Sequence, residues 1–120
     1  MLLGYARVST GDQDLALQRA SLKDAGCRKI FEEKVSGAKR ARAELDRLLE
    51  HLREGDVVIV SRLDRLARST RDLLTLAEEI AERGAGLRSL AEPWADTTSA
   101  AGKMVLTVFA GIAEFERSLI

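Results

Sequence analysis

The sequence predicts an α/β fold, with a mainly parallel central sheet, helices on both of its faces and a long C-terminal helix. Strand-like and helix-like patterns alternate along the 120 residues, which is typical of a parallel sheet with crossover helices. The β-branched run over residues 57–60 is typical of a strand that is covered on both faces. No internal repeat or Gly/Ser linker interrupts the chain, so we expect one compact core.

The N-terminal half begins with an apolar strand over residues 2–8. Thr10 and Gln13 form a capping-box pattern, which predicts a helix over residues 10–25 that Gly26 ends. Residues 29–31 predict a short second strand. Residues 33–40, with Ser36-Gly37 and little periodicity, predict a mobile loop.

The second half continues the alternation. A helix over residues 41–53 carries leucines on one side, and Gly55-Asp56 predicts a turn before the strand over residues 57–60. A third helix is expected over residues 69–83, followed by Gly84 and a strand over residues 87–90. We therefore expect an α/β domain over residues 1–100 and the start of a long helix over residues 101–120.

The last helix carries two neighbouring apolar stripes. The first is formed by Met104, Val108, Ile112, Phe115 and Leu119, and the second by Val105, Phe109 and Ala113. A helix that packs on one sheet needs a single stripe. Two stripes favour packing on a second subunit as well, and the alternative is a core helix that is buried all round.

Composition narrows the class of protein. The formal net charge is zero, but residues 34–71 hold ten Lys and Arg against six Asp and Glu, which fits a local phosphate-binding face or a helix surface with ion pairs. Aromatic residues make up 4%, which argues against binding of single strands by stacking. One cysteine excludes an internal disulfide, and no apolar run has the length of a membrane helix. No signal peptide is recognised, so we expect a cytoplasmic protein without contact to a membrane.

Two polar clusters follow predicted strands. Ser9 ends the first strand, with Arg7 two residues before it, and Arg62 follows the strand over residues 57–60. Because ligands of parallel sheets bind outside the carboxyl ends of the strands, both clusters can reach one site. Each cluster also has a plain alternative, a helix cap for Ser9 and a solvated helix face for the arginines.

The arginines favour phosphodiester chemistry. Arg62, Arg65 and Arg68 recur at a spacing of three, and Asp64 can pair with Arg68 if the segment is helical. Guanidinium groups bind the non-bridging oxygens of a phosphodiester in bidentate fashion, where negative charge develops during attack. Arg7 can favour the alkoxide of Ser9, but arginine is a poor general base, so the proton acceptor stays open.

Other kinds of catalytic site fit the sequence less well. A serine hydrolase needs a base, but His51 is the one histidine and is expected on the surface of a helix. No Gly-x-Ser-x-Gly motif surrounds Ser9. A P-loop motif is absent from the sequence. Asp64 and Glu33 alone make a weak case for a metal-dependent nuclease.

The chain resembles the serine recombinases of the resolvase/invertase group, and specifically their N-terminal catalytic domain. The motifs that carry the resemblance are Tyr5-Ala6-Arg7-Val8-Ser9-Thr10 with Gln13 and Gln18, Ser36-Gly37 with Arg42, Leu63-Asp64-Arg65-Leu66-Ala67-Arg68, Gly102-Lys103-Met104, and Ala113-Glu114-Phe115-Glu116-Arg117. They cover essentially the whole chain in the order and spacing of that family.

The resemblance implies that Ser9 attacks double-stranded DNA and forms a 5′-phosphoserine link with a free 3′-hydroxyl. Arg7, Arg65 and Arg68 are implied to bind the scissile phosphate, and Asp64 to orient the arginines or assist proton transfer. The residues implied to complete the site or to contact DNA phosphates are Gln13, Gln18, Ser36, Arg42, Lys34 and Arg62. No metal, cofactor or ATP is implied.

The resemblance also implies an assembly, a homodimer that becomes a homotetramer during strand exchange. The implied interface residues are Met104, Val105, Val108, Phe109, Ile112 and Phe115. Members of this family usually continue into a helix-turn-helix domain, whereas this sequence reaches Ile120 within the helix. Two alternatives therefore stay open, a non-catalytic oligomerisation module and a phospho-signalling or nucleotide-binding α/β domain.

Overall fold

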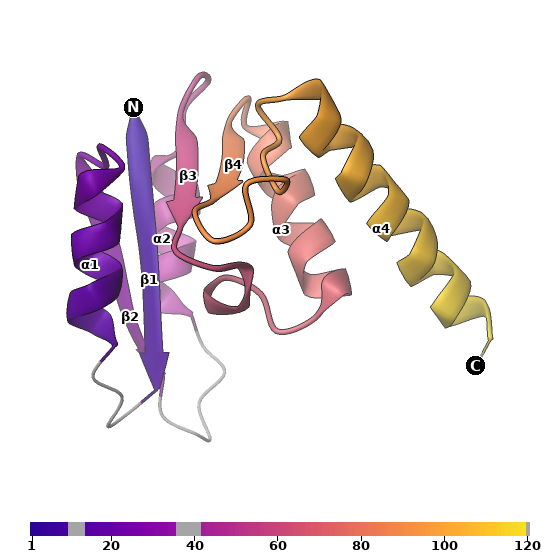
Figure 1. Cartoon of the computed structure of the whole chain (residues 1–120), viewed down its shortest axis with the longest axis horizontal. Coiled ribbons are helices and arrows are strands. Elements are labelled where there is room, and N and C mark those ends of the chain that lie inside the picture. Colours follow the sequence, from indigo (N-terminus) through magenta and orange to yellow (C-terminus); the bar gives the residue numbers. More distant parts are fainter. Residues whose placement is uncertain (10–13, 36–41, 120) are drawn as a thin grey trace.

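The computed structural model describes residues 1–9, 14–35 and 42–119; residues 9, 35, 113, 116 and 117 are described by their backbone alone. A parallel four-stranded sheet forms the centre of this part of the chain, with the strand order β2-β1-β3-β4 (Figure 1). The strands are β1 (Leu2–Ser9), β2 (Lys29–Val35), β3 (Val57–Val60) and β4 (Gly86–Ser89).

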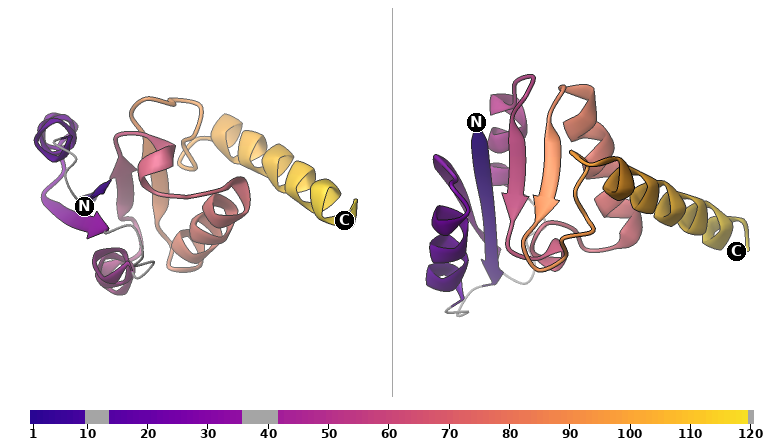
Figure 2. Two further views of the ribbon diagram at one scale, coloured as in Figure 1. Left: turned by 90° about the horizontal axis from the view of Figure 1, so that it is seen from below. Right: turned by 45° about the horizontal axis from the view of Figure 1, so that its top comes forward.

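Helices cover both faces of this sheet, as Figure 2 shows. The helices are α1 (Leu15–Asp24), α2 (Ala43–His51), α3 (Thr70–Glu82) and α4 (Ala100–Ser118), and η1 (Leu63–Arg65) is a single 3-10 turn. Helix α1 lies on one face, α2 and α3 lie on the other, and α4 packs beside α3 and extends away from the sheet (Figure 1). The predicted fold class is confirmed.

The side chains of β1 alternate between two apolar cores, because successive residues of a strand point to opposite faces. Leu3 and Tyr5 are buried in the larger core with α2 and α3. Ala6 is buried in the smaller core, where it packs with Leu22 of α1 and Ile59 of β3. The central strand is thus held on both faces, which fixes the direction in which its C-terminal residues leave the core.

Two expectations for the first half are corrected. The second strand does not end at residue 31 but runs to Val35, because β1 is long enough to pair with it up to the Ser9–Val35 register. Residues 33–35 therefore belong to β2 and not to a loop; residues 36–41 lie outside the described part. Helix α1 is described from Leu15, and the capping pattern over residues 10–13 also lies outside it.

Helix α1 ends where the sequence predicts, just before Gly26. Gly26 has φ of 95°, a left-handed conformation that glycine adopts without strain. The N–H of Cys27 donates to the Leu22 carbonyl and the N–H of Gly26 to the Lys23 carbonyl. This is the Schellman pattern of helix termination.

Helix α4 meets the domain through only part of its surface. Leu106 is buried in the larger core, and Phe109 packs on Trp94 with ring centroids 5.5 Å apart. At Gly102 the backbone of the helix passes so close to Asp96 that a Cβ atom would overlap the Asp96 carbonyl oxygen. The first predicted stripe is exposed: Met104 by 64%, Val108 by 57%, Ile112 by 46%, Phe115 by 63% and Leu119 by 71%.

Candidate active site

The C-terminal end of β1 extends beyond its neighbour β3. The register of these strands ends at the Tyr5–Val60 pair, so β1 continues from Ala6 to Ser9 past the end of β3. The chain that follows β3 lies beside this extension, and Arg7 Nη2 donates to the Asp64 carbonyl oxygen at 2.6 Å. The two predicted clusters therefore meet at one edge of the sheet, as expected from the parallel topology. The Ser9 side chain lies outside the described part.

Gln18 of α1 fixes the backbone of β1 at Arg7. Its Oε1 accepts a hydrogen bond from the Arg7 N–H at 3.1 Å, and its Nε2 donates to the Arg7 carbonyl at 3.0 Å. The side chain of Gln18 is buried, and Nε2 also donates to Asp14 Oδ2 at 3.1 Å. A buried amide with these partners acts as a rigid spacer between α1 and the residues that precede Ser9.

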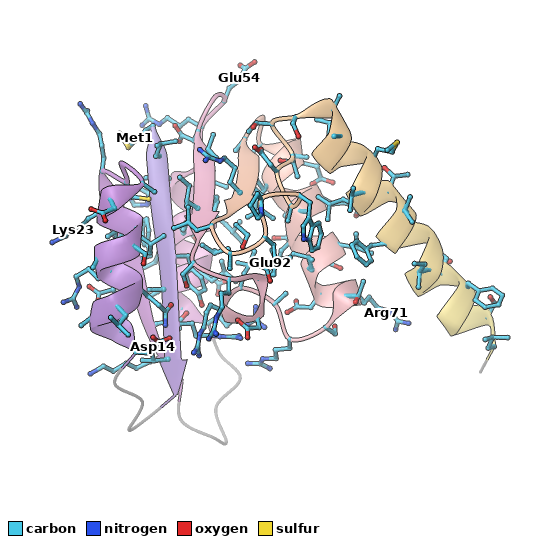
Figure 3. All side chains as sticks on the ribbon, viewed as in Figure 1. Met1, Asp14, Lys23, Glu54, Arg71 and Glu92 are labelled. Carbon is cyan, nitrogen blue, oxygen red and sulfur yellow. The ribbon has the colours of Figure 1, made fainter. Side chains whose placement is uncertain are left out.

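Arg65 reaches the same edge from η1. Its Nη2 donates to Asp14 Oδ2 at 2.9 Å, so one carboxylate oxygen accepts from both Arg65 and Gln18. Asp14 is the residue directly before α1, and Figure 3 shows it at the end of the molecule toward which β1 runs. Arg65 is thereby held beside the last residues of β1.

Arg42 approaches from the other side of the sheet, directly before α2. Its Nη1 donates to the Leu66 carbonyl at 2.7 Å and its Nη2 to Asp72 Oδ2 at 2.8 Å. The backbone N–H of Arg68 donates to the same Asp72 oxygen at 3.0 Å. One carboxylate of α3 thus holds the guanidinium group of Arg42 and the backbone of Arg68.

The guanidinium groups are close enough to affect one another. Burial lowers the pKa of Arg7, and the charges of Arg42 and Arg68 lower it further. Arginine nevertheless stays charged at neutral pH, because its usual pKa exceeds about 12. The site therefore concentrates positive charge where an anion can bind between fixed guanidinium groups.

The segment that carries three of the predicted arginines is not a continuous helix. Only Leu63–Arg65 forms a helical turn, and α3 begins at Thr70 after the Ser69 cap. The expected helical spread of Arg62, Arg65 and Arg68 is therefore wrong, and so is the Asp64–Arg68 pair derived from it. The Asp64 carboxylate lies 3.4 Å from Arg62 Nε instead.

The remaining predicted site residues fall into two groups. Lys34 is exposed near the end of β2, paired in register with Val8. Arg62 is half-exposed beside Asp64. Gln13 and Ser36 lie outside the described residues, so their expected roles stay predictions.

Glu33 supports the site without joining it. Although charged, this side chain is buried, and it accepts hydrogen bonds from the Tyr5 hydroxyl and from the backbone N–H groups of Glu44 and Leu45. It therefore caps the N-terminus of α2, directly after Arg42. Glu33 lies two residues after buried Phe31 on β2, which is the sequence signal for an inward side chain. The prediction of a strand over residues 29–31 and a loop over residues 33–40 missed this signal.

Asp14 and Asp72 were also missed by sequence reasoning. Both are ordinary polar residues at the start of helices, a place where acidic residues are common for helix stability alone. Their contacts with Arg65 and Arg42 depend on which helices the sheet brings together, and that information is not local in the sequence.

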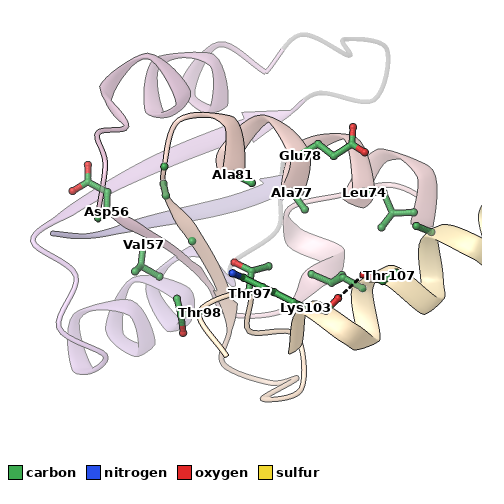
Figure 4. A pocket seen from close by; sticks show the side chains of 16 residues that line it. Asp56, Val57, Leu74, Ala77, Glu78, Ala81, Thr97, Thr98, Lys103 and Thr107 are labelled. Atoms are coloured by element: carbon green, nitrogen blue, oxygen red, sulfur yellow. Dashed lines mark hydrogen bonds between the residues drawn. The ribbon is translucent and has the colours of Figure 1, made fainter. Parts of the chain in front are cut away.

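A groove of about 670 Å³ lies elsewhere, between α3, α4 and the start of β3 and β4 (Figure 4). It is mainly apolar, with Leu74, Ala77, Ala81 and Leu106 among its lining residues, and Lys103 and Glu78 add charge. None of the arginines of the candidate site line it, so it is separate from the site at the end of β1.

Among the residues that the structure describes, no group of three or more His, Cys, Asp or Glu side chains is placed to hold a metal ion. The helices in this part of the chain are also too short or too polar to span a membrane.

The described residues form a parallel α/β domain in which Arg7, Arg42, Arg65 and Arg68 lie near the carboxyl end of β1, an arrangement that can bind an anion. The sequence matches the family described as "Resolvase, N terminal domain" over residues 2–120. The chain therefore belongs to the resolvase/invertase group of serine recombinases.

Individual relatives agree with this assignment. The chain is 50% identical to the transposon Tn552 DNA-invertase BinR of Staphylococcus aureus over its whole length, which is 63% of that protein. It is 48% identical to the serine recombinase gin of Escherichia phage Mu, of which it covers 62%. The chain thus spans about three fifths of the length of these relatives.

Solved structures show the same fold. The N-terminal catalytic domain of TP901-1 integrase superimposes with a TM-score of 0.83 at 33% identity, covering 98% of this chain and 97% of that one. A resolvase family site-specific recombinase from Streptococcus pneumoniae gives a TM-score of 0.76 at 25% identity, covering 98% of this chain and 87% of that one.

Proposed function

We propose that the chain is the catalytic domain of a site-specific DNA recombinase. Ser9 Oγ attacks the phosphorus of a phosphodiester in double-stranded DNA and loses its proton, and the P–O3′ bond breaks. The products are a 5′-phosphoserine ester and a 3′-hydroxyl, whose oxygen has gained a proton. Attack by the 3′-hydroxyl of another strand reverses these steps and rejoins the DNA. One phosphate ester replaces another, so the proposal needs no nucleotide.

The main support is the convergence of Arg7, Arg42, Arg65 and Arg68 at the carboxyl end of β1, whose last residue is Ser9. Negative charge develops on the non-bridging oxygens as Ser9 attacks. Guanidinium groups that are already fixed in place stabilise that charge without reorganising, and each such donor contributes about 10²–10³ in rate. We assign Arg7, Arg65 and Arg68 to the scissile phosphate.

Asp64 has an orienting role in this proposal. Its carbonyl oxygen accepts from Arg7, and its carboxylate pairs with Arg62. Gln18 holds the backbone of Arg7 in place, while Lys34 and Arg62 add positive charge for neighbouring DNA phosphates.

The assembly is part of the proposal. The exposed stripe of α4, residues 104, 108, 112, 115 and 119, is a contiguous apolar face larger than isolated surface residues explain. A second copy of the chain buries this face in a homodimer, and two dimers form a tetramer during strand exchange. Val105 and Phe109 contribute less to this proposed interface, because both side chains are partly covered by their own domain.

The test is a covalent protein–DNA adduct. A chimera that joins residues 1–120 to the remaining C-terminal part of BinR is incubated with DNA that carries the BinR recombination site. We expect protein linked to 5′ DNA ends, and its complete loss in Ser9→Ala. Ser21→Ala, at an exposed position of α1, is the matched control and should leave the adduct unchanged. An adduct that persists in Ser9→Ala contradicts the proposal, as does its absence in the unmodified chimera while BinR itself forms one.

A further inference from the structure

Asp72 lies within the candidate site, although sequence analysis predicted no role for it. It is the third residue of α3, and its carboxylate contacts two of the arginines of the candidate site. The ion pair with Arg42 is well shielded, with the Arg42 side chain 11% exposed and that of Asp72 32% exposed. A pair this enclosed is screened by solvent less than a surface pair.

Helix capping explains only part of this arrangement. Ser69 Oγ accepts from the Asp72 N–H at 3.1 Å, and Asp72 Oδ2 accepts from the Arg68 N–H, which together resemble a capping box shifted by one residue. Capping gives no reason for Arg42 Nη2 to donate to the same oxygen from a segment 30 residues earlier. The carboxylate therefore has a second partner that helix stability does not require.

The two contacts of Arg42 fix its orientation. Nη1 is held by the Leu66 carbonyl and Nη2 by Asp72, so two points on one segment hold the planar guanidinium group. An arginine has five N–H donors in a rigid fork. The directions of the other donors of Arg42 are therefore set by its contacts with Leu66 and Asp72.

Asp72 also balances the charge of the cluster. Arg42 and Arg68 lower the pKa of Arg7, whereas Asp72 acts in the opposite direction. Partial burial by itself raises the pKa of Asp72, but hydrogen bonds from the Arg68 N–H and from Arg42, with the charges of both arginines, outweigh it and lower the pKa. Asp72 is therefore ionised at neutral pH, and it holds the Arg42 guanidinium group beside the backbone of Arg68 before any phosphate binds.

We propose that Asp72 is a positioning residue, which orients Arg42 as a supporting residue of the anion-binding site through a hydrogen-bonded ion pair without touching DNA itself. This inference rests on the proposed function for its catalytic consequence. Its structural part, the ordering of Arg42 by Asp72, stands independently and can be measured without DNA.

The first experiment is a double-mutant cycle in the chimera. The rate of adduct formation at saturating DNA is compared for Asp72→Asn, Arg42→Gln and the double variant. We expect Asp72→Asn to lower the rate about 10- to 100-fold, because a misplaced catalytic group costs about that much. The DNA concentration for half-maximal rate should change less than about twofold. Since Asp72 acts through Arg42, the double variant should be no slower than Arg42→Gln alone.

Two controls separate positioning from folding. Ser69→Ala removes the helix cap but leaves the Arg42–Asp72 contact, and should lower the melting temperature while keeping the rate within about twofold. Glu78→Gln removes an exposed carboxylate from the same helix and should change neither the melting temperature nor the rate of adduct formation. Asp72→Glu keeps the charge and should restore part of the lost rate. Full activity of Asp72→Asn, or losses that multiply in the double variant, overturns the inference.

The second experiment uses the 120-residue chain without DNA. Nitrogen-15 NMR of the arginine side chains should show slow guanidinium rotation and slow proton exchange for Arg42, both lost in Asp72→Asn and kept in Glu78→Gln. An unchanged Arg42 signal in Asp72→Asn refutes the inference whether or not the chimera is active. If the chimera forms no adduct but the Arg42 signal responds as expected, the proposed function fails and the ordering of Arg42 by Asp72 stands.

Discussion

Tyr5 and Glu33 form a buried polar pair in the middle of the larger core. The Tyr5 hydroxyl donates to Glu33 Oε1 at 3.3 Å, and neither side chain has more than slight exposure. Burial raises the pKa of Tyr5 above its ordinary value, and the Glu33 charge raises it further. A neutral phenol is therefore strongly favoured in the folded protein, two residues before Arg7 on the same strand.

This pair predicts a loss of stability at high pH. The unfolded chain loses the Tyr5 proton near pH 10, whereas the folded chain keeps it, so the contribution is complete below about pH 10. Above that pH the free energy of unfolding should fall by up to about 1.4 kcal/mol per pH unit from Tyr5 alone. Urea unfolding at several pH values measures this fall in the free energy of unfolding. The Tyr5→Phe variant should lack the part that comes from Tyr5.

Because Tyr5 is the one tyrosine of the sequence, its ionisation can be followed directly by phenolate absorbance. The folded protein should show no phenolate at pH 10, where the urea-unfolded chain is about half ionised. Half ionisation of the folded protein near pH 10 contradicts the described burial.

At the scale of elements, the start of α2 is stabilised from outside the helix. Arg42, at the N-cap position, makes no side-chain cap, and its guanidinium group is engaged at the candidate site instead. Glu33 of β2 accepts from the N–H groups of Glu44 and Leu45 in its place. The strand thus performs the capping, which leaves the residue at the helix start available for the site.

Removing this cap should weaken the fold measurably. Glu33→Ala leaves two helix N–H groups and the Tyr5 hydroxyl without their acceptor, at a cost of about 1–3 kcal/mol. Glu32→Ala is the matched control on the same strand, since it removes an ion pair with Arg19 near the surface and should cost clearly less. Chemical denaturation of both variants measures the difference, and equal losses would show that Glu33 does not cap α2.

The sequence predicted the elements that have strong periodicity or turn chemistry. The strand over residues 57–60, the Gly26 stop and the leucine face of α2 are confirmed, because each depends on neighbouring residues alone. The end of β2 was predicted too early, since residues 33 and 34 are charged and pair only because β1 lies beside them. The arginine segment was expected to be helical, but its contacts with Arg7 and Arg42 come from other elements.

At the scale of the whole molecule, α4 is the element with the least support from its own domain. Leu106 is its buried anchor, whereas the stripe that begins at Met104 faces away from the sheet. Figure 1 shows the helix running beyond α3, with its C-terminal end far from the strands. The folded monomer therefore carries an apolar face that association with a second copy would cover.

A charge in the middle of this face should prevent association. Val108→Glu places a carboxylate where the proposed homodimer excludes water, whereas the monomer already exposes this position. We expect sedimentation velocity to show concentration-dependent association of the unmodified chain and a monomer for Val108→Glu, with unchanged circular dichroism. Thr107→Glu, on the adjoining side that lines the groove, is the control and should still associate. Association of Val108→Glu at the original concentrations would place the interface elsewhere.

The close passage of Gly102 against Asp96 holds α4 to the domain near the N-terminal end of the helix, so this contact would be the pivot of any tilt of α4. From Gly102 to Ser118 the helix is roughly 24 Å long at about 1.5 Å per residue. A tilt of about 10° at the pivot therefore sweeps the far tip through roughly 4 Å, as simple geometry on that length requires. Because a Cβ atom at position 102 would collide with the Asp96 backbone, a larger residue there would push this end of α4 away from the domain and displace the whole helix.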